Sequence, residues 1–151
     1  MKKILQILGG IGVVLVIVFA GGVGQIVGKS TTERFFDGKN ESQLNSVLMH
    51  AASELNKNLP MMVDSETRLD STVGINKQFR YNYTMINFLE SEIDVPAFKE
   101  AMSPYVRNGV CTTEEMKVFV TNDVPVTYAY FDKDGKQFAI ITIQPTECAS
   151  S

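Results

Sequence analysis

The chain has few of the side chains that most often carry catalysis or bind metal. It contains one histidine, His50, and two cysteines, Cys111 and Cys148, whose separation gives no C-x-x-C spacing. A zinc site needs about four such ligands. A hydrolase of the Ser-His-Asp or Cys-His type would depend on His50, and nothing around it suggests such a role. We therefore expect no cofactor, no metal site and no enzymatic activity.

Charge is absent from residues 4–28. As a helix rising about 1.5 Å per residue, this stretch would exceed a hydrocarbon core of about 30 Å. We predict a membrane anchor at residues 1–29 and a juxtamembrane connector at 30–40. Val18-Phe19-Ala20 also fits a signal peptidase site, so cleavage after Ala20 and release into the periplasm is the alternative. No cysteine stands directly after the apolar run, where a lipoprotein would carry its lipid-modified cysteine, so a lipoprotein is excluded.

Glycines are frequent in the apolar segment. Four of them fall within an arc of about 60° on a helix, namely Gly10, Gly21, Gly24 and Gly28. Small residues at such spacing let membrane helices pack closely, in a homo-oligomer or against another protein. The alternative is that glycine is simply common in membrane helices.

Basic residues form no cluster in the rest of the chain. Three of the fourteen Lys and Arg residues precede Ser30, so eleven remain against seventeen Asp and Glu, a net charge of −6. An acidic surface of this kind repels phosphate backbones, which excludes nucleic acid as a partner.

Hydrophobic periodicity predicts a domain at residues 41–151 with helices and strands in the order α-ββ-αα-ββ. The helices are expected at 41–59, from Val95 and at 116–120, and the strands at 67–75, 79–88, 124–131 and 136–143. The strands pair as two hairpins. We predict an α+β fold in which a four-stranded antiparallel sheet packs against the helices.

The strand patterns also predict which side chains face the core. In residues 67–75, Leu69, Val73 and Ile75 should share one face, opposite Asp70 and Thr72. The last strand, residues 136–143, is more uniformly apolar than the others and is therefore expected at the centre of the sheet.

The two cysteines are expected to form a disulfide. A bond between Cys111 and Cys148 would close a loop of about 38 residues and stabilise the domain by about 3 to 4 kcal/mol. Two free core thiols or a reactive pair are the alternatives. Basic residues on the two sides of the apolar segment nearly balance, so the disulfide favours a periplasmic domain and a cytoplasmic N-terminus.

Four tyrosines alternate along two predicted strands: Tyr81, Tyr83, Tyr128 and Tyr130. Each pair presents its rings on one face of its strand. The rings belong either to the core or to an exposed surface that contacts a protein or peptide.

These features predict a membrane-anchored periplasmic protein of the bacterial inner membrane that binds another envelope protein without catalysis. An accessory subunit of an envelope assembly and an inhibitor of the immunity or exclusion type both fit. The alternative is an enzyme that acts on an envelope glycan through carboxylates near Glu90 and Glu92.

Overall fold

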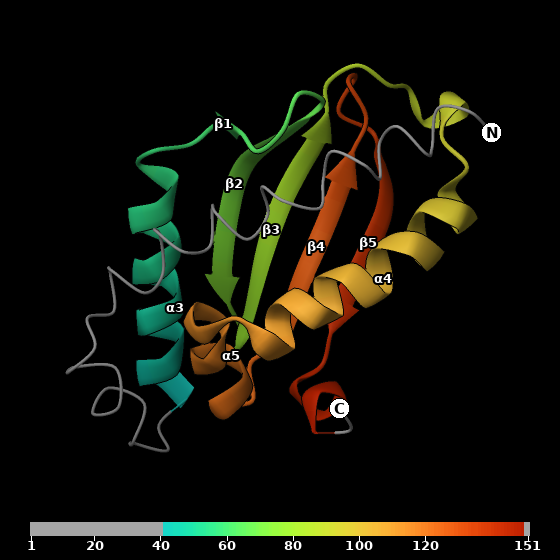
Figure 1. Ribbon diagram of the computed structural model, residues 1–151. Coiled ribbons are helices and arrows are strands. Elements are labelled where there is room, and N and C mark those ends of the chain that lie inside the picture. Colours follow the sequence, from blue (N-terminus) through green and yellow to red (C-terminus); the bar gives the residue numbers. More distant parts are fainter. Residues whose placement is uncertain (1–40, 150–151) are drawn as a thin grey trace.

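The structure, a computed structural model, describes residues 41–149 (Figure 1). The predicted anchor at 1–29, the connector at 30–40 and the four glycines of the apolar segment lie outside the described residues. The described part contains three α-helices and five strands: α3 (Glu41–Asn56), β1 (Met61–Met62), β2 (Thr67–Ile75), β3 (Gln78–Met85), α4 (Val95–Thr112), α5 (Lys117–Thr121), β4 (Val126–Phe131) and β5 (Gln137–Ile143).

The five strands form one sheet in the order β1-β2-β3-β4-β5. Strands β3 and β4 are parallel, and the other neighbours are antiparallel. The predicted four-stranded antiparallel sheet is therefore wrong, although both predicted hairpins are present. The connection between the hairpins contains α4 and α5, and a crossover of this length returns the chain to the same end of the sheet, as parallel pairing requires.

Between residues 41 and 149, no helix combines the length and the apolar character needed to cross a membrane. The transmembrane helix of the predicted fold class is thus not part of the described structure.

Helix α4 begins as its sequence predicts. Asp94 is the N-cap, and its carboxylate accepts a hydrogen bond of 3.1 Å from the backbone N–H of Ala97. The helix continues through Pro104 to Thr112. In the short 3-10 helix that follows α4, the side chain of the N-cap residue Thr113 makes no capping hydrogen bond.

All the α-helices of the described part lie on one face of the sheet, which we call the inner face (Figure 1). Helix α3 approaches β2 closely at Gly74, where an added Cβ would overlap the backbone oxygen of Leu48. The inner face of β3 and β4 carries the aromatic core: Phe79, Tyr81, Tyr83, Tyr128 and Tyr130. Phe98 of α4 and Phe119 of α5 pack against this row.

A β-bulge in β2 reverses the predicted facing of three residues: Thr72 is buried on the inner face, whereas Val73 and Ile75 are exposed. Leu69 pairs with Tyr83, and Ser71 pairs with Asn82, so Asp70 is an extra residue in the ladder. One inserted residue shifts the alternation of all that follow. Val73 and Ile75 therefore point away from the helices, with 43% and 50% of their surface exposed.

Strand β5 lies at the edge of the sheet, not at its centre as predicted. Its inward residues Ala139, Ile141 and Ile143 are buried, whereas Ile140 on the other face is 41% exposed. The inward side chains of β5 are apolar because they pack in the core beside α4 (Figure 1). An edge strand can be buried in this way by a helix, so an apolar sequence does not require a strand on each side.

Candidate functional site

The face of the sheet opposite the helices, which we call the open face, carries most of the polar side chains of the strands. It contains a shallow hollow of about 710 Å³ that opens to solvent. The hollow is lined by side chains of β2, β3 and β4 and by the turns beside them: Asp70, Ser71, Val73, Ile75, Asn76, Gln78, Arg80, Asn82, Thr84, Phe131 and Gly135.

Arg80 lies within this lining and is held by two amide side chains. Its Nε donates to Oδ1 of Asn82 at 2.7 Å, and its Nη2 donates to Oε1 of Gln137 at 2.8 Å. The guanidinium carbon is 6.0 Å from the centre of the Phe131 ring. Asn82 in turn donates to Oγ of Ser71 at 3.0 Å. Three strands thus fix the position of one guanidinium group.

The bulge in β2 brings a carboxylate into the same lining. Asp70 forms an ion pair with Arg68 and accepts a hydrogen bond from the hydroxyl of Thr84. Consecutive residues of a regular strand point to opposite faces, but Asp70 and Ser71 both interact with side chains of the open face. The bulge, in which Asp70 is the extra residue, explains this shared orientation. The bulge therefore shapes the hollow as well as the register of the strand.

Apolar side chains border the polar centre. Val73 and Ile75 on β2 and Ile140 on β5 are exposed, and Phe131 is half-buried. A surface with exposed aliphatic side chains around fixed hydrogen-bonding groups is suited to reversible binding, because the apolar groups supply affinity and the polar groups supply orientation.

The described residues contain no group of three or more His, Cys, Asp or Glu side chains arranged to hold a metal ion. His50 lies on the exposed side of α3. The lining of the hollow presents one arginine, one carboxylate, amides and hydroxyls.

The four predicted tyrosines lie in the core of the inner face and not on an exposed surface. Each has at most 2% of its surface exposed. The rings stack in a ladder, with centroids 5.6 Å apart for Tyr81 and Tyr128 and 5.5 Å apart for Tyr83 and Tyr130. Burial raises the pKa of all four hydroxyls. The alternative that these tyrosines form a contact surface is therefore wrong.

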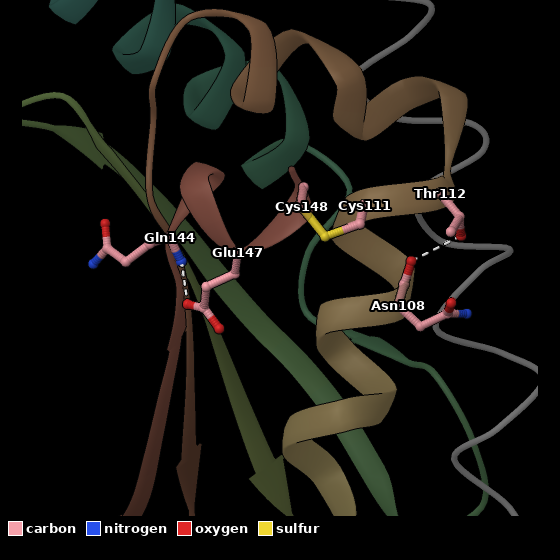
Figure 2. Close-up of a disulfide and its surroundings, with 6 residues drawn as sticks. All are labelled: Asn108, Cys111, Thr112, Gln144, Glu147 and Cys148. Carbon is pink, nitrogen blue, oxygen red and sulfur yellow. Dashed lines mark hydrogen bonds between the residues drawn. A yellow bond between two sulfur atoms is a disulfide. The ribbon is translucent and has the colours of Figure 1, made fainter. Parts of the chain in front are cut away.

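Cys111 and Cys148 are joined by a disulfide, with their Cα atoms 5.1 Å apart (Figure 2). The bond links the last turn of α4 to the short 3-10 helix that follows β5. A hydrogen bond of 2.8 Å from the backbone N–H of Gln144 to the Glu147 carboxylate holds the start of that helix. The disulfide fixes the C-terminal segment on the helical layer.

The acidic residues of the glycan-enzyme alternative are engaged in structural contacts. Glu90 pairs with Lys136, and the Glu92 carboxylate accepts a hydrogen bond of 3.0 Å from the backbone N–H of Leu89. Nearby Asp132 is buried and accepts from the backbone N–H groups of Glu90, Lys136 and Asp134, which lower its pKa, the bond from Glu90 most. These contacts organise the β4–β5 turn.

Sequence reasoning missed the residues of the hollow. A signal was present in β3, where Arg80, Asn82 and Thr84 alternate with the buried aromatic residues. That alternation identifies an exposed polar face. It does not reveal that the bulge adds Asp70, or that Gln137 of a distant strand completes the support of Arg80.

The fold is shared with solved structures of a secreted protein and of two secretion-system pilotins. A crystal structure described as a secreted protein from Pseudomonas aeruginosa matches with a TM-score of 0.64 and 12% identity, covering 74% of this chain and 97% of that one. A pilotin of the type 2 secretion system of Vibrio vulnificus matches with a TM-score of 0.57 and 9% identity, covering 72% and 94%. The type II secretion pilotin of Vibrio cholerae gives 0.54 and 9%, with the same coverage.

At these identities the likeness concerns the fold alone. No curated protein matches the sequence significantly. A family model described as a domain of unknown function, DUF8479, matches residues 43–139, which span the sheet from α3 into β5. The chain therefore belongs to the DUF8479 family.

Proposed function

We propose that this protein is a non-catalytic accessory protein of the bacterial envelope, and that its open face binds a segment of another envelope protein. The observation that carries the proposal is the hollow of the open face, where the exposed aliphatic side chains Val73 and Ile75 lie beside a fixed polar centre. Exposed apolar side chains gathered around polar groups are characteristic of protein-binding surfaces.

The fold supports an accessory role. Two of the solved structures that share it are pilotins of type II secretion systems. By analogy of fold, which is weaker support than the site itself, we propose that the partner is a component of an envelope assembly of the secretion type.

The disulfide supports a periplasmic location for the domain, since such bonds persist in oxidising compartments. Residues 1–29 would deliver the domain to the envelope, because their uncharged run has the character of an export segment. Whether they are retained in the inner membrane or removed after Ala20 stays a prediction from the sequence.

The test compares two exposed apolar positions on opposite sides of the molecule. Ile75 is 50% exposed at the hollow, and Met49 is 57% exposed on α3. The tagged full-length chain would be expressed in its own bacterium, cross-linked and isolated from the envelope, with Ile75→Asp and Met49→Asp in parallel. We expect Ile75→Asp to lose the cross-linked partner and Met49→Asp to keep it.

Two results would overturn the proposal. One is a partner that both variants retain, which would place the binding surface elsewhere. The other is a partner in the cytoplasm, which would remove the envelope location. Identification of the partner by mass spectrometry then tests whether it belongs to a secretion-type assembly.

A further inference from the structure

Arg80 is a cation without an acidic partner in the described structure. Both of its hydrogen bonds are to neutral amide oxygens, those of Asn82 and Gln137. Among residues 41–149, no carboxylate forms an ion pair with it; Asp70, the acid in the same lining, pairs with Arg68 instead. A guanidinium group has more donors than these two contacts use. Arg80 can therefore bind an anion without losing an existing interaction.

The charge of the hollow differs from that of the domain. The lining contains one acid and one base, Asp70 and Arg80, so its net charge is zero, and Asp70 is already paired with Arg68 outside the lining. The chain from Ser30 onward carries −6, with eleven Lys and Arg against seventeen Asp and Glu. An anionic group is therefore repelled less by the hollow than by most of the remaining surface, and Arg80 is the group that can attract it there.

The guanidinium is also oriented in advance. Its contacts come from β3 and β5, and the ring of Phe131 lies beside it on β4. Contacts from three strands limit the rotation of a side chain that would otherwise be mobile, which reduces the entropy lost on binding. A planar guanidinium held in this way matches a carboxylate, which it binds through two parallel hydrogen bonds.

The rest of the lining fits a peptide. The amide side chains of Asn76 and Gln78 can donate to and accept from peptide groups. Val73 and Ile75 are exposed at the same hollow and can bury an apolar side chain. An amide lining with an aliphatic border beside one arginine suits a carboxylate that is carried on a peptide next to an apolar residue.

We propose that the hollow of the open face recognises a carboxylate on a peptide segment of the partner, with Arg80 as its anchor. Val73 and Ile75 receive the neighbouring apolar side chain. This inference rests on the proposed function and names the chemistry by which the open face selects its ligand.

The test uses small probes that separate charge from peptide character. The ¹⁵N-labelled full-length chain in detergent micelles would be titrated with N-acetyl-leucine and, separately, with its uncharged analogue N-acetyl-leucinamide. We expect N-acetyl-leucine to shift the Nε–H signal of Arg80 and the backbone amides of Val73 and Ile75 in a saturable manner. The uncharged analogue should bind about tenfold more weakly, as expected for loss of a charge-assisted hydrogen bond.

Variants establish whether Arg80 is the anchor. Arg80→Gln should weaken N-acetyl-leucine binding about tenfold. Arg80→Lys keeps the charge but lacks the planar pair of donors, so its affinity should lie between those of wild type and Arg80→Gln. Arg107→Gln, on the exposed side of α4, is the matched control and should bind as wild type does. The spectrum of each variant reports directly whether it is folded.

Three results would overturn the carboxylate proposal. The first is equal binding of N-acetyl-leucine and N-acetyl-leucinamide. The second is tighter binding of inorganic phosphate than of N-acetyl-leucine, which would favour a phosphate group such as that of a lipid. The third is a saturable shift at Arg80 with N-acetylglucosamine, which would favour a glycan.

Failure of this inference can be distinguished from failure of the proposed function. If Ile75→Asp loses the partner in cells while Arg80→Gln keeps it, the open face binds the partner but not through a carboxylate. If both variants keep the partner, the open face is not the binding surface and both proposals fall.

Discussion

The two faces of the sheet are built from the same strands, residue by residue in alternation, and they have opposite character. The inner face of β3 carries Phe79, Tyr81 and Tyr83, all buried under the helical layer. The open face of the same strand carries Arg80, which donates to Asn82, and Thr84, which donates to Asp70 of β2; Asn82 in turn donates to Ser71 of β2. One strand thus contributes both to the core and to the candidate binding surface.

The difference separates stability from binding. Aromatic rings that are fully buried contribute several kcal/mol each through transfer from water and packing. Exposed or half-buried polar side chains contribute little, because water satisfies them equally well in the unfolded chain. Substitutions on the inner face should therefore lower stability, whereas those on the open face should alter binding and leave the fold intact.

The largest effect is expected from Tyr83 on the inner face. Tyr83→Ala should lower the free energy of unfolding by about 3 to 5 kcal/mol, since it leaves a cavity in the aromatic ladder. Tyr83→Phe should equal or exceed the wild type, because within the described structure the Tyr83 hydroxyl is buried without a hydrogen-bond partner. Urea denaturation of both variants measures this. A cost above about 1 kcal/mol for Tyr83→Phe would mean that the hydroxyl is bonded.

The disulfide should have the next largest effect, and it acts on the helical layer alone. Replacing Cys111 and Cys148 together by alanine should lower stability by about 3 to 4 kcal/mol, as the unfolded chain regains its freedom. Binding at the open face of the folded variant should be unchanged. Urea denaturation measures the loss of stability, and partner capture measures binding, with the reduced wild-type protein as the comparison. Loss of partner binding in the folded variant would contradict the separation of stability and binding between the two faces.

Gly74 tests the close approach of α3 to the inner face. Gly74→Ala should cost about 1 to 3 kcal/mol, because the added methyl group meets backbone atoms of Leu48 that cannot move alone. The control is Gly109 in α4, where an added Cβ meets nothing within 4 Å. Gly109→Ala should stabilise the protein by about 0.5 to 1 kcal/mol. Equal effects of the two variants in thermal or urea unfolding would contradict the packing described for α3.

Asp132 links stability to pH at the end of the β4–β5 turn. Its pKa is lowered in the folded state by backbone donors, first of all the N–H of Glu90. The stabilisation should be complete above the unfolded pKa of about 3.9 and should be lost as the pH falls through the lower folded pKa. Asp132→Asn should flatten the pH dependence of stability in this acidic range. An unchanged profile between wild type and variant would contradict the role of these backbone donors.

The smallest change in stability is expected on the open face itself. Ile75→Ser should alter the free energy of unfolding by no more than about 0.5 kcal/mol, since the side chain is half in water already. The same variant should weaken binding of the partner. A cost in urea denaturation as large as that of Gly74→Ala would show that Ile75 belongs to the core.

The sequence predicts the inner face better than the open face, for a physical reason. Alternating aromatic residues in β3 and β4 and the Asp94 cap of α4 are local signals, and local signals determine which side of an element is buried. The parallel pairing of β3 with β4 depends on how a long connection returns, which no local pattern encodes. Strand β1 consists of only two residues and leaves no periodicity to detect.

The hollow depends on such non-local features. The bulge at Asp70 turns Val73 and Ile75 outward, so a pattern with strict alternation assigns them to the core. Gln137 reaches Arg80 across the intervening strand, from a position 57 residues away in the chain. The residues of the candidate site are therefore visible in the sequence, whereas their assembly into one site is not.

Photo-cross-linking from the two faces in living cells would show whether the open face is the surface that binds the partner. A benzophenone amino acid would replace Gln78, exposed at the hollow, or Glu100, exposed on α4. We expect a discrete cross-linked product with one envelope protein from position 78 and none from position 100. The same product from position 100, or no product from position 78, would contradict the assignment of binding to the open face.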